Sequence, residues 1–443
     1  MRQGGNMKQS GNSMHSQQIL ARAIFDDIAR LTRDGEGVTR ESFGEGEELA
    51  MRAIERHAID IGLATERDRY QNLWMRLPND SRTEAPVVIG SHLDSVPQGG
   101  NYDGLAGVVA GMLVLQRLRE APEVAPPVRV LALRGEESAW YGKAYTGSLA
   151  LLGKLPAGAL ALRHRSGKGT LGEAMSRSGM DIDAIMQGEA LVTPADIAAW
   201  LELHIEQGPV MVARGWPAAV VTGIRGNIRY THVECIGETG HSGAVPRWLR
   251  HDAVLATADL LSRMDEHWRV LLQMGMDLVM TTGILSTPAQ SHAVSVIPGN
   301  VGFSFEIRSQ DADTLNRFHA LMQEECKAVE KARGVRFEFG ECLRTAPAQM
   351  DEGWIRCIEE ASSLHGEPIE RIPSGAGHDA AVFANAGIPA AMVLVRNEHG
   401  SHNVHEAMED ADFVAGVDLL YQALLHAPGV PRQAPQQPEL VGV

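Results

Sequence analysis

The stretch PVVIGSHLDSVPQGGNYDGLAG, residues 86–107, decides the fold. Its apolar and β-branched start, residues 86–89, has the pattern of a buried strand that ends at the edge of a site. His92 follows this strand, and after a glycine-rich loop Asp103 opens an apolar segment that is predicted to be a helix. Open α/β sheets bind ligands beyond the carboxyl ends of their strands, so His92 and Asp103 are candidates for one metal site.

Length and charge limit the class of protein. A chain of 443 residues is too long for one typical domain and predicts two. The net charge of −16 argues against nucleic acid or an anionic membrane as a partner, and no segment is apolar over the length of a membrane span. A small anionic substrate remains compatible with this charge, because such a substrate needs only a local cation.

The N-terminus and the cysteines indicate a compartment. Residues 1–18 are polar and lack the apolar core of a signal peptide, which predicts a disordered leader and a cytoplasmic protein. The four cysteines have no C-x-x-C spacing, so they suit a reducing compartment and predict neither a disulfide framework nor a thiolate zinc site.

Strands that alternate with helices predict an α/β catalytic domain. Apolar runs at residues 86–89, 128–133, 200–205 and 391–395 are the expected strands, with helical periodicity between them. This order predicts a mostly parallel sheet that is covered by helices.

A second type of pattern interrupts this domain near residue 216. Alternating strands and two helices follow the order β-α-β-β-α-β, which resembles a ferredoxin-like α+β domain. The expected organisation is a catalytic domain in two parts, residues 19–216 and 342–426, an inserted domain, residues 217–341, and disordered tails, residues 1–18 and 427–443.

Five residues of metal-ligand type stand at strand ends or in the loops beyond them: His92, Asp103, Glu137, His204 and His402. Any one of these histidines alone would more often be an ordinary surface or core residue. Together they offer the imidazole and carboxylate groups that zinc, manganese or cobalt prefer where thiolates are absent. Asp103 is a candidate to bridge two ions, because a carboxylate has two oxygens.

Glu136 stands beside Glu137, just past the expected strand at residues 128–133. An isolated pair of glutamates would usually be a solvated acidic turn. At a strand end, however, both side chains can face the cleft. One then binds a metal ion while the other takes a proton from the activated water, so Glu136 is the candidate general base.

Seven motifs carry a family resemblance, in the order GSHLDSVPQGGNYDG, GEES, LELHIEQGP, GHSGAVP, VIPGNVGFSFEIRS, SGAGHDA and GSHN. They resemble the hydantoinase/carbamoylase branch of the dinuclear-metal aminoacylase/carboxypeptidase superfamily. The resemblance extends over residues 19–425. It implies an amidohydrolase that cleaves non-peptide C–N bonds, as do N-carbamoyl-L-amino acid hydrolases, β-ureidopropionases and allantoate amidohydrolases. It also implies an α/β catalytic domain interrupted by a lid that forms a homodimer.

The resemblance implies roles for the candidate ligands. Two divalent ions (zinc, manganese or cobalt) are expected, one held by His92, Asp103 and His204, the other by Asp103, Glu137 and His402. Glu136 takes the role of general base. Asp94 is expected to orient His92 from behind the ligands.

Further roles follow from the same resemblance. His241 matches a histidine that stabilises the tetrahedral oxyanion, with a reach across the dimer, and Arg308 matches an arginine that clamps the substrate carboxylate. Gln207, Ser295 and Gly377 match substrate-binding positions. Without the family, His241 and Arg308 would be read as ordinary surface groups.

The sequence departs from the family pattern around the expected substrate. Ser295 and His292 each replace a usual asparagine, and Arg396 and His399 introduce cations in the loop before His402. We therefore expect an anionic N-carbamoyl or N-acyl amino acid, bulkier than the standard substrates. Four histidines are expected not to be ligands: His292, His378, His399 and His405, of which His378, with Asp379, should shape the cleft.

The leading hypothesis is a metal-dependent amidohydrolase that acts on a small amino-acid derivative, with neither nucleic acid nor membrane as a partner. Two alternatives stay open. One is an allantoate or ureidoglycolate amidohydrolase or a dipeptidase. The other is a catalytically inactive binding protein on the same fold, against which the presence of Glu136 and all five ligand-type residues counts.

Overall fold

The computed structural model describes residues 3–364 and 369–427. It divides into two compact units, each described here by itself. Unit 1 takes the chain up to residue 222, residues 350–372 and the chain from residue 378. Unit 2 takes residues 223–349 and 373–377, so it is an insertion in the chain of unit 1.

The sheet of unit 1 has a parallel centre. Strands β19, β7, β5 and β6 lie side by side in this order, and each is parallel to its neighbour. Antiparallel strands β4 and β3 continue the sheet beyond β6, and β8 lies antiparallel to β19. The prediction of a mixed α/β fold with parallel central strands is confirmed. The strands are β1 Arg33–Asp34, β2 Gly37–Val38, β3 Ala64–Arg67, β4 Leu73–Arg76, β5 Val87–His92, β6 Val128–Leu133, β7 Ala199–Ile205, β8 Ala218–Ile224, β18 Glu370–Ser374, β19 Ala390–Val395, β20 Asn397–Glu398 and β21 Ala407–Met408.

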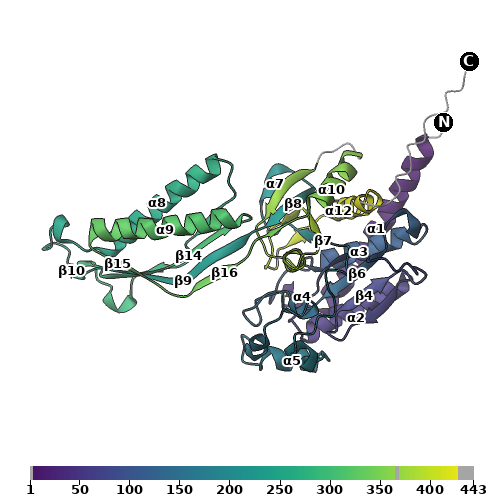
Figure 1. Ribbon diagram of the computed structural model, residues 1–443, viewed down its shortest axis with the longest axis horizontal. Helices are drawn as coiled ribbons and strands as arrows, with labels where there is room; N and C mark the ends of the chain where they lie inside the picture. Colours follow the sequence, from purple (N-terminus) through teal and green to yellow (C-terminus); the bar gives the residue numbers. More distant parts are fainter. Residues whose placement is uncertain (1–2, 365–368, 428–443) are drawn as a thin grey trace, which may run out of the picture. The chain divides into compact units, whose positions relative to one another are not determined.

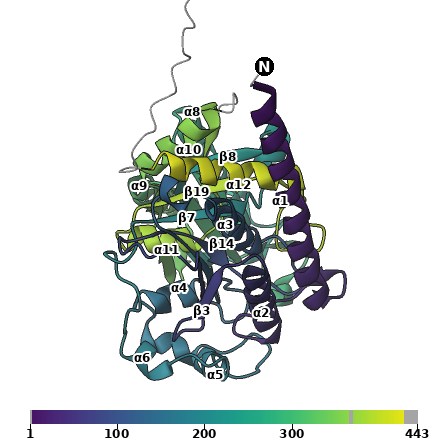
Figure 2. The same cartoon turned by 90° about the vertical axis from the view of Figure 1, so that its right-hand side faces the viewer.

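Helices of unit 1 cover this sheet. Helix α3 packs against β5, β6 and β7, while α1, α3 and α12 pack against one another (Figure 2). The helix α3 is buried over most of its length because its residues are almost all apolar or small. None of the helices in the described ranges combines the length and apolar character needed to cross a membrane. The helices are α1 Gln3–Leu31, α2 Glu45–Asp60, α3 Leu105–Leu118, α4 Thr146–Leu151, α5 Leu171–Arg177, α6 Ile182–Met186, α7 Val210–Arg214, α10 Glu352–Leu364, α11 Asp379–Asn385 and α12 Asp410–Leu425.

The N-terminal segment differs from the expectation of a disordered leader over residues 1–18. Residues 3–18 belong to helix α1, which continues into the expected apolar face of Ile24 and Ile28. Gln17 is buried, and its amide donates a hydrogen bond to the Leu113 carbonyl at 3.3 Å, which ties this polar part of the helix to α3. Of the expected tail at residues 427–443, all but Ala427 lies outside the described residues.

Unit 2 contains a β-α-β-β-α-β module. Its antiparallel sheet has the order β11-β14-β9-β15, and helices α8 and α9 lie along one side of it (Figure 1). The elements are β9 Gly226–Ile236, β10 Gly240–His241, α8 Ala253–Gln273, β11 Val279–Thr281, β12 Leu285–Ser286, β13 Val296–Ile297, β14 Asn300–Ser309, α9 Ala312–Arg333, β15 Arg336–Phe339, β16 Cys342–Thr345 and β17 Ala348–Gln349. Helix α9 ends where Gly334 turns into the left-handed region at φ +66°, as glycine does at helix ends.

A separate hydrophobic core holds unit 2 together. Inward residues of β9 and β14, among them Val233 and Phe305, alternate with more exposed ones, and they pack against Leu260 of α8 and Phe318 of α9. The alternation has the period of two that a half-buried strand requires. Unit 2 extends to residue 349, beyond the expected end of the inserted domain at residue 341, because β16 still pairs with β9.

Candidate metal centre

Three buried side chains converge at the carboxyl ends of two neighbouring strands. His92 is the last residue of β5, His204 is the last but one of β7, and Asp103 stands just before α3. The Oδ1 atom of Asp103 lies 3.5 Å from Nε2 of His92 and 3.3 Å from Nε2 of His204. These three residues form a group that can hold a metal ion. Their positions follow from the parallel register of β5 and β7, which brings both strand ends to one edge of the sheet.

A second group shares Asp103. Its other oxygen, Oδ2, lies 3.3 Å from Nε2 of His402, and that nitrogen lies 3.3 Å from Oε1 of Glu137. Asp103, Glu137 and His402 form another candidate metal-binding group. The two oxygens of Asp103 thus face different groups, which is the arrangement that a bridging carboxylate requires.

The donor atoms fit divalent cations. Oε1 of Glu137 is buried and accepts no hydrogen bond from the residues that the structure describes. A buried carboxylate oxygen of this kind is costly unless a cation satisfies it. Three imidazoles and two carboxylates, without a thiolate, suit zinc, manganese or cobalt.

Backbone carbonyls set the tautomers of two histidines. Nδ1 of His92 lies 3.0 Å from the Asp94 carbonyl oxygen, and Nδ1 of His204 lies 3.0 Å from the Ile205 carbonyl oxygen. Each Nδ1 therefore carries the proton, which leaves Nε2 as the free acceptor that a metal ion needs. The backbone N–H of Gly104, 3.2 Å from Nε2 of His204, is consistent with that unprotonated nitrogen.

The Asp94 side chain contacts the turn that carries Glu136 and Glu137. Its carboxylate accepts the backbone N–H groups of Glu136 and Glu137, each at 3.0 Å, and the Ser42 hydroxyl at 2.5 Å. The same carboxylate lies 3.4 Å from Nδ1 of His92, farther than the Asp94 carbonyl oxygen. Burial opposes the ionisation of Asp94, but His92 and the hydrogen bonds lower its pKa below the usual value. The closest contacts of the Asp94 carboxylate are thus with the backbone of the two glutamates and with Ser42, and its contact with His92 is longer.

Glu136 is buried and free of both candidate groups. Its nearest oxygen lies 3.9 Å from Nε2 of His92, which is beyond hydrogen-bond distance. Burial and the neighbouring charge of Glu137 raise the pKa of Glu136 well above its usual value. A carboxyl group that stands beside the ligands without belonging to them is placed as a general base must be.

Gly104 leaves the space in which the His92 ring lies. Its backbone has φ +69°, in the left-handed region that favours glycine, and a Cβ there would lie 2.5 Å from ring atoms of His92. The glycine after Asp103 is therefore required by the geometry of the first group.

Gln207 contacts Asp103 directly. Its side-chain amide donates a hydrogen bond to Oδ2 of Asp103 at 2.7 Å, and its backbone has φ +64°. The backbone N–H of Gln207 donates in turn to the side chain of Asn397 at 2.9 Å. Non-glycine residues in the left-handed region concentrate at functional sites, and His402, at φ +60°, is another.

The remaining expected site residues belong to unit 2. His241 of β10 is exposed, and its Nδ1 accepts the Gly243 N–H at 3.1 Å. Arg308 of β14 donates to the Gly375 carbonyl at 3.1 Å and pairs with Glu306 at 3.1 Å. The two other residues in this unit are Ser295, an exposed residue before β13, and Gly377.

The departures from the family pattern have specific neighbours. Arg396 forms a two-contact ion pair with Asp412, at 2.8 and 3.2 Å, so its charge is already compensated. That pair removes Arg396 from the cations offered to a substrate. His399 is exposed and has φ +65°.

His378 stands in a third buried group, with Glu202 and His204. Oε1 of Glu202 accepts the Ser91 hydroxyl at 2.7 Å, and Oε2 accepts the indole N–H of Trp200 at 3.1 Å and the Ala380 N–H at 2.9 Å. These contacts give Glu202 a structural role at the start of α11. The other three histidines expected not to be ligands, His292, His399 and His405, belong to none of the candidate groups among the described residues.

Sequence reasoning missed two buried charged residues behind this centre, Arg40 and Glu406. Glu406 follows His402 by four positions, so its proximity to the GSHN motif was a usable signal. Arg40 lies far along the chain from every motif, and nothing in the sequence alone pointed to it.

Known proteins are similar to this chain in sequence and in fold. A model of peptidase family M20/M25/M40 matches residues 88–426. The N-carbamoyl-L-amino acid amidohydrolase of Geobacillus stearothermophilus is 33% identical over 88% of this chain and 93% of that protein. The allantoate amidohydrolase of Bacillus subtilis is 33% identical over 92% of this chain and 99% of that protein. The structure of a hydantoinase/carbamoylase family amidase from Burkholderia ambifaria is similar with a TM-score of 0.81 and 30% identity, over 94% of this chain and 97% of that one.

Proposed function

Because this chain belongs to peptidase family M20/M25/M40, we propose that it is a metal-dependent amidohydrolase that cleaves the ureido or amide C–N bond of an N-carbamoyl- or N-acyl-L-amino acid. Three similar proteins carry the name N-carbamoyl-L-amino acid amidohydrolase, which supports this substrate class. The observation that carries the proposal is Asp103, whose two oxygens face two separate groups of ligands beside an unligated Glu136.

The proposed centre holds two divalent ions, zinc, manganese or cobalt. One set of ligands is His92, Asp103 and His204; the other is Asp103, Glu137 and His402. Bound ions supply an activated water molecule and polarise the carbonyl group of the substrate.

Glu136 moves the proton in this reaction. Its carboxylate takes a proton from the attacking water and gives it to the leaving nitrogen. The Asp94 carboxylate accepts the backbone N–H of Glu136 and so holds this residue in place. Glu136 is buried, which keeps bulk water from its carboxyl group. His241 stabilises the oxyanion, and Arg308 binds the substrate carboxylate in the bidentate manner of arginine. Gln207, Ser295 and Gly377 complete the substrate contacts.

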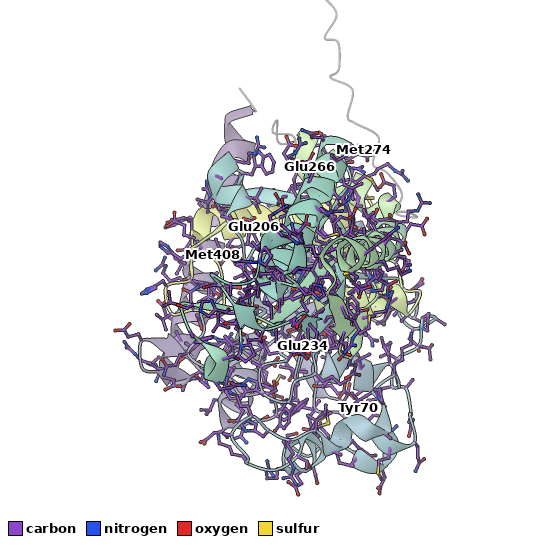
Figure 3. All side chains as sticks on the ribbon, turned by 90° about the vertical axis from the view of Figure 1, so that its left-hand side faces the viewer. Tyr70, Glu206, Glu234, Glu266, Met274 and Met408 are labelled. Carbon is purple, nitrogen blue, oxygen red and sulfur yellow. The ribbon has the colours of Figure 1, made fainter. Side chains whose placement is uncertain are left out.

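The proposed assembly is a homodimer through unit 2, which would serve as lid and dimerisation domain. Large apolar side chains on this unit are exposed, including Trp248 at 83% and Met274 at 69%. Met274, just past the end of α8, is labelled in Figure 3. Single exposed apolar residues are normal on protein surfaces, so the proposed dimer rests on the family resemblance, and these residues are candidates for its contact. None of the four cysteines of the chain, all within the described residues, forms a disulfide, which suits the cytoplasm as the proposed compartment.

Allantoate is the second candidate substrate. The Bacillus subtilis allantoate amidohydrolase is as similar to this chain as the carbamoylase is, at 33% identity. A dipeptidase or a ureidoglycolate amidohydrolase is a weaker alternative, and a catalytically inactive binding protein would have no use for Glu136.

A substrate panel tests the proposal. The metal-free protein is loaded with Mn²⁺, Zn²⁺ or Co²⁺ and assayed on N-carbamoyl, N-formyl and N-acyl amino acids, allantoate and dipeptides. We expect the highest kcat/KM on an N-carbamoyl- or N-acyl-L-amino acid. Turnover confined to uncharged amides would contradict the proposed substrate class, and full activity of Glu136→Gln would contradict the mechanism.

A further inference from the structure

The loop that carries His402 is closed at its base. Strand β20 pairs antiparallel with β21, through Asn397↔Met408 and Glu398↔Ala407, so residues 399–406 form the tip of a hairpin. His402 lies within this tip, with its side chain 51% exposed and its backbone at φ +60°. By contrast, His92 and His204 are buried on neighbouring parallel strands. His402 is therefore the ligand whose position depends most on its loop.

Glu406 fastens this tip to the loop that carries Asp103. Its Oε1 atom accepts the backbone N–H of Tyr102 at 2.7 Å and that of Asp103 at 3.3 Å. Glu406 is only 8% exposed, so these bonds are made out of water, in a low-dielectric environment that strengthens a hydrogen bond. The contact joins two segments that are about 300 residues apart in the chain, as the separation of 304 between Glu406 and Tyr102 shows.

Gly100 provides the room for Glu406. A Cβ at position 100 would collide with the carboxyl carbon and the Cβ of Glu406. Gly100 precedes the two N–H donors on the same loop, so the loop is shaped around the carboxylate.

Stability alone does not account for a carboxylate at this place. Oε2 of Glu406 is buried and accepts no hydrogen bond within the described part of the chain, and the nearby negative charge of Asp103 disfavours the ionised form. Both features cost folding free energy. The buried cation Arg40 compensates part of this charge, and it also donates a hydrogen bond to the Asp103 carbonyl at 3.2 Å.

We propose that Glu406 is a positioning residue that fixes the distance between Asp103 and His402 and thereby sets the affinity for the second ion. The inference rests on the proposed metal centre and deepens it. Asp103 belongs to both sets of ligands, but its loop keeps the hydrogen bond from Arg40 to the Asp103 carbonyl when Glu406 is lost. Glu406 is also part of the hairpin tip that carries His402, and His402 belongs to the second set alone. Loss of the tether should therefore weaken the second ion and leave the first nearly unchanged.

Glu406→Ala tests this in the full-length, metal-free protein, titrated with Mn²⁺ or Zn²⁺ by calorimetry. The wild type should bind two ions. In Glu406→Ala the second ion should bind about 10- to 100-fold more weakly, the effect of removing a partner that holds a ligand, while the first keeps its affinity. Glu398→Ala is the matched control, because Glu398 is an exposed glutamate in the same hairpin.

Two further variants separate positioning from general damage. Glu406→Gln keeps an oxygen that accepts the two N–H groups and should restore most of the affinity for the second ion, whereas Gly100→Ala should displace the carboxylate and reproduce the selective loss. Equal weakening of both ions, or an unchanged second ion in Glu406→Ala, would overturn the inference while the metal centre stands. A wild type that binds no ion would overturn both. Circular dichroism of each metal-free variant shows whether it folds.

Discussion

Asp94→Ala should displace Glu136, the proposed general base, from its place beside the metal centre. The carboxylate accepts two backbone N–H groups, those of Glu136 and Glu137, at 3.0 Å each. Hydrogen bonds to a charged group contribute about 1.5–3 kcal/mol each, so the two together contribute about 3–6 kcal/mol to holding the turn. None of the metal ligands is removed, but Glu137 loses the same support as Glu136, so the placement of the base and the affinity for the second ion should both suffer.

The size of the kinetic effect has an upper limit. A general base contributes roughly 10²- to 10⁴-fold to the rate, so a misplaced Glu136 cannot lose more than that range. We expect kcat of Asp94→Ala to fall about 10²-fold, with KM on an N-carbamoyl-L-amino acid nearly unchanged, because Glu136 acts on water. Asp94→Asn keeps one acceptor oxygen and should lose about tenfold, the rate equivalent of about 1.4 kcal/mol.

Steady-state kinetics at saturating metal, with the ion content of each variant measured beside it, is the assay. An Asp94→Ala variant that retains both ions and a kcat within twofold of the wild type would refute the reasoning. A variant that loses its ions and keeps its rate per bound ion would show that Asp94 supports the ligands His92 and Glu137 rather than Glu136.

Three further outcomes are expected. Asp103→Ala should abolish the binding of both ions, whereas His92→Ala should weaken the binding of one. The ion content of the dialysed variants, measured by inductively coupled plasma mass spectrometry, tests this. An equal loss of ions in both variants would argue against Asp103 as a bridge. Gly104→Ala should cost at least about 1 kcal/mol for its left-handed backbone, and in addition displace the His92 ring, so both the melting temperature and the affinity for the first ion should fall. With a thiol reagent at pH 8, Cys342 should react first, because it is half-buried while the other three cysteines are buried. Burial also raises the pKa of Cys235 to about 11 and keeps it as an unreactive thiol. Rapid labelling of all four cysteines in the native protein would contradict the structure.

Much of the fold follows from sequence periodicity. The strand at residues 128–133 has the bounds that its pattern predicts, because it is a continuous apolar run between clear breakers. The edge strand β3 and its neighbour β4 escaped prediction, because both are short and carry exposed or half-buried residues. Helix α1 was expected to start later, because its first turns are polar and carry glycine.

The residues of the candidate site also fall into some that the sequence predicts and others that it does not. Ligands at the ends of buried strands, such as His92 and His204, can be placed from sequence, since parallel strands end at one edge. The hydrogen bonds that the Asp94 carboxylate accepts from the Glu136 and Glu137 backbone were not predictable, because a backbone partner leaves no signal in the residue types. Its proximity to His92 was predicted. Glu406 was missed for a related reason: buried ionised residues are rare, and its partners are remote in the chain.

Arg40 has a consequence for how the protein acquires its ions. Its guanidinium is completely buried, and the acidic groups around it include Asp94, Asp103, Glu137 and Glu406. Burial lowers the pKa of Arg40 and these carboxylates raise it, and an arginine stays protonated in proteins. The chain thus carries an internal counter-charge, so the polypeptide is expected to fold before any ion arrives. Which ion it then takes would be decided by cellular supply, after folding is complete, and could change during the protein's lifetime.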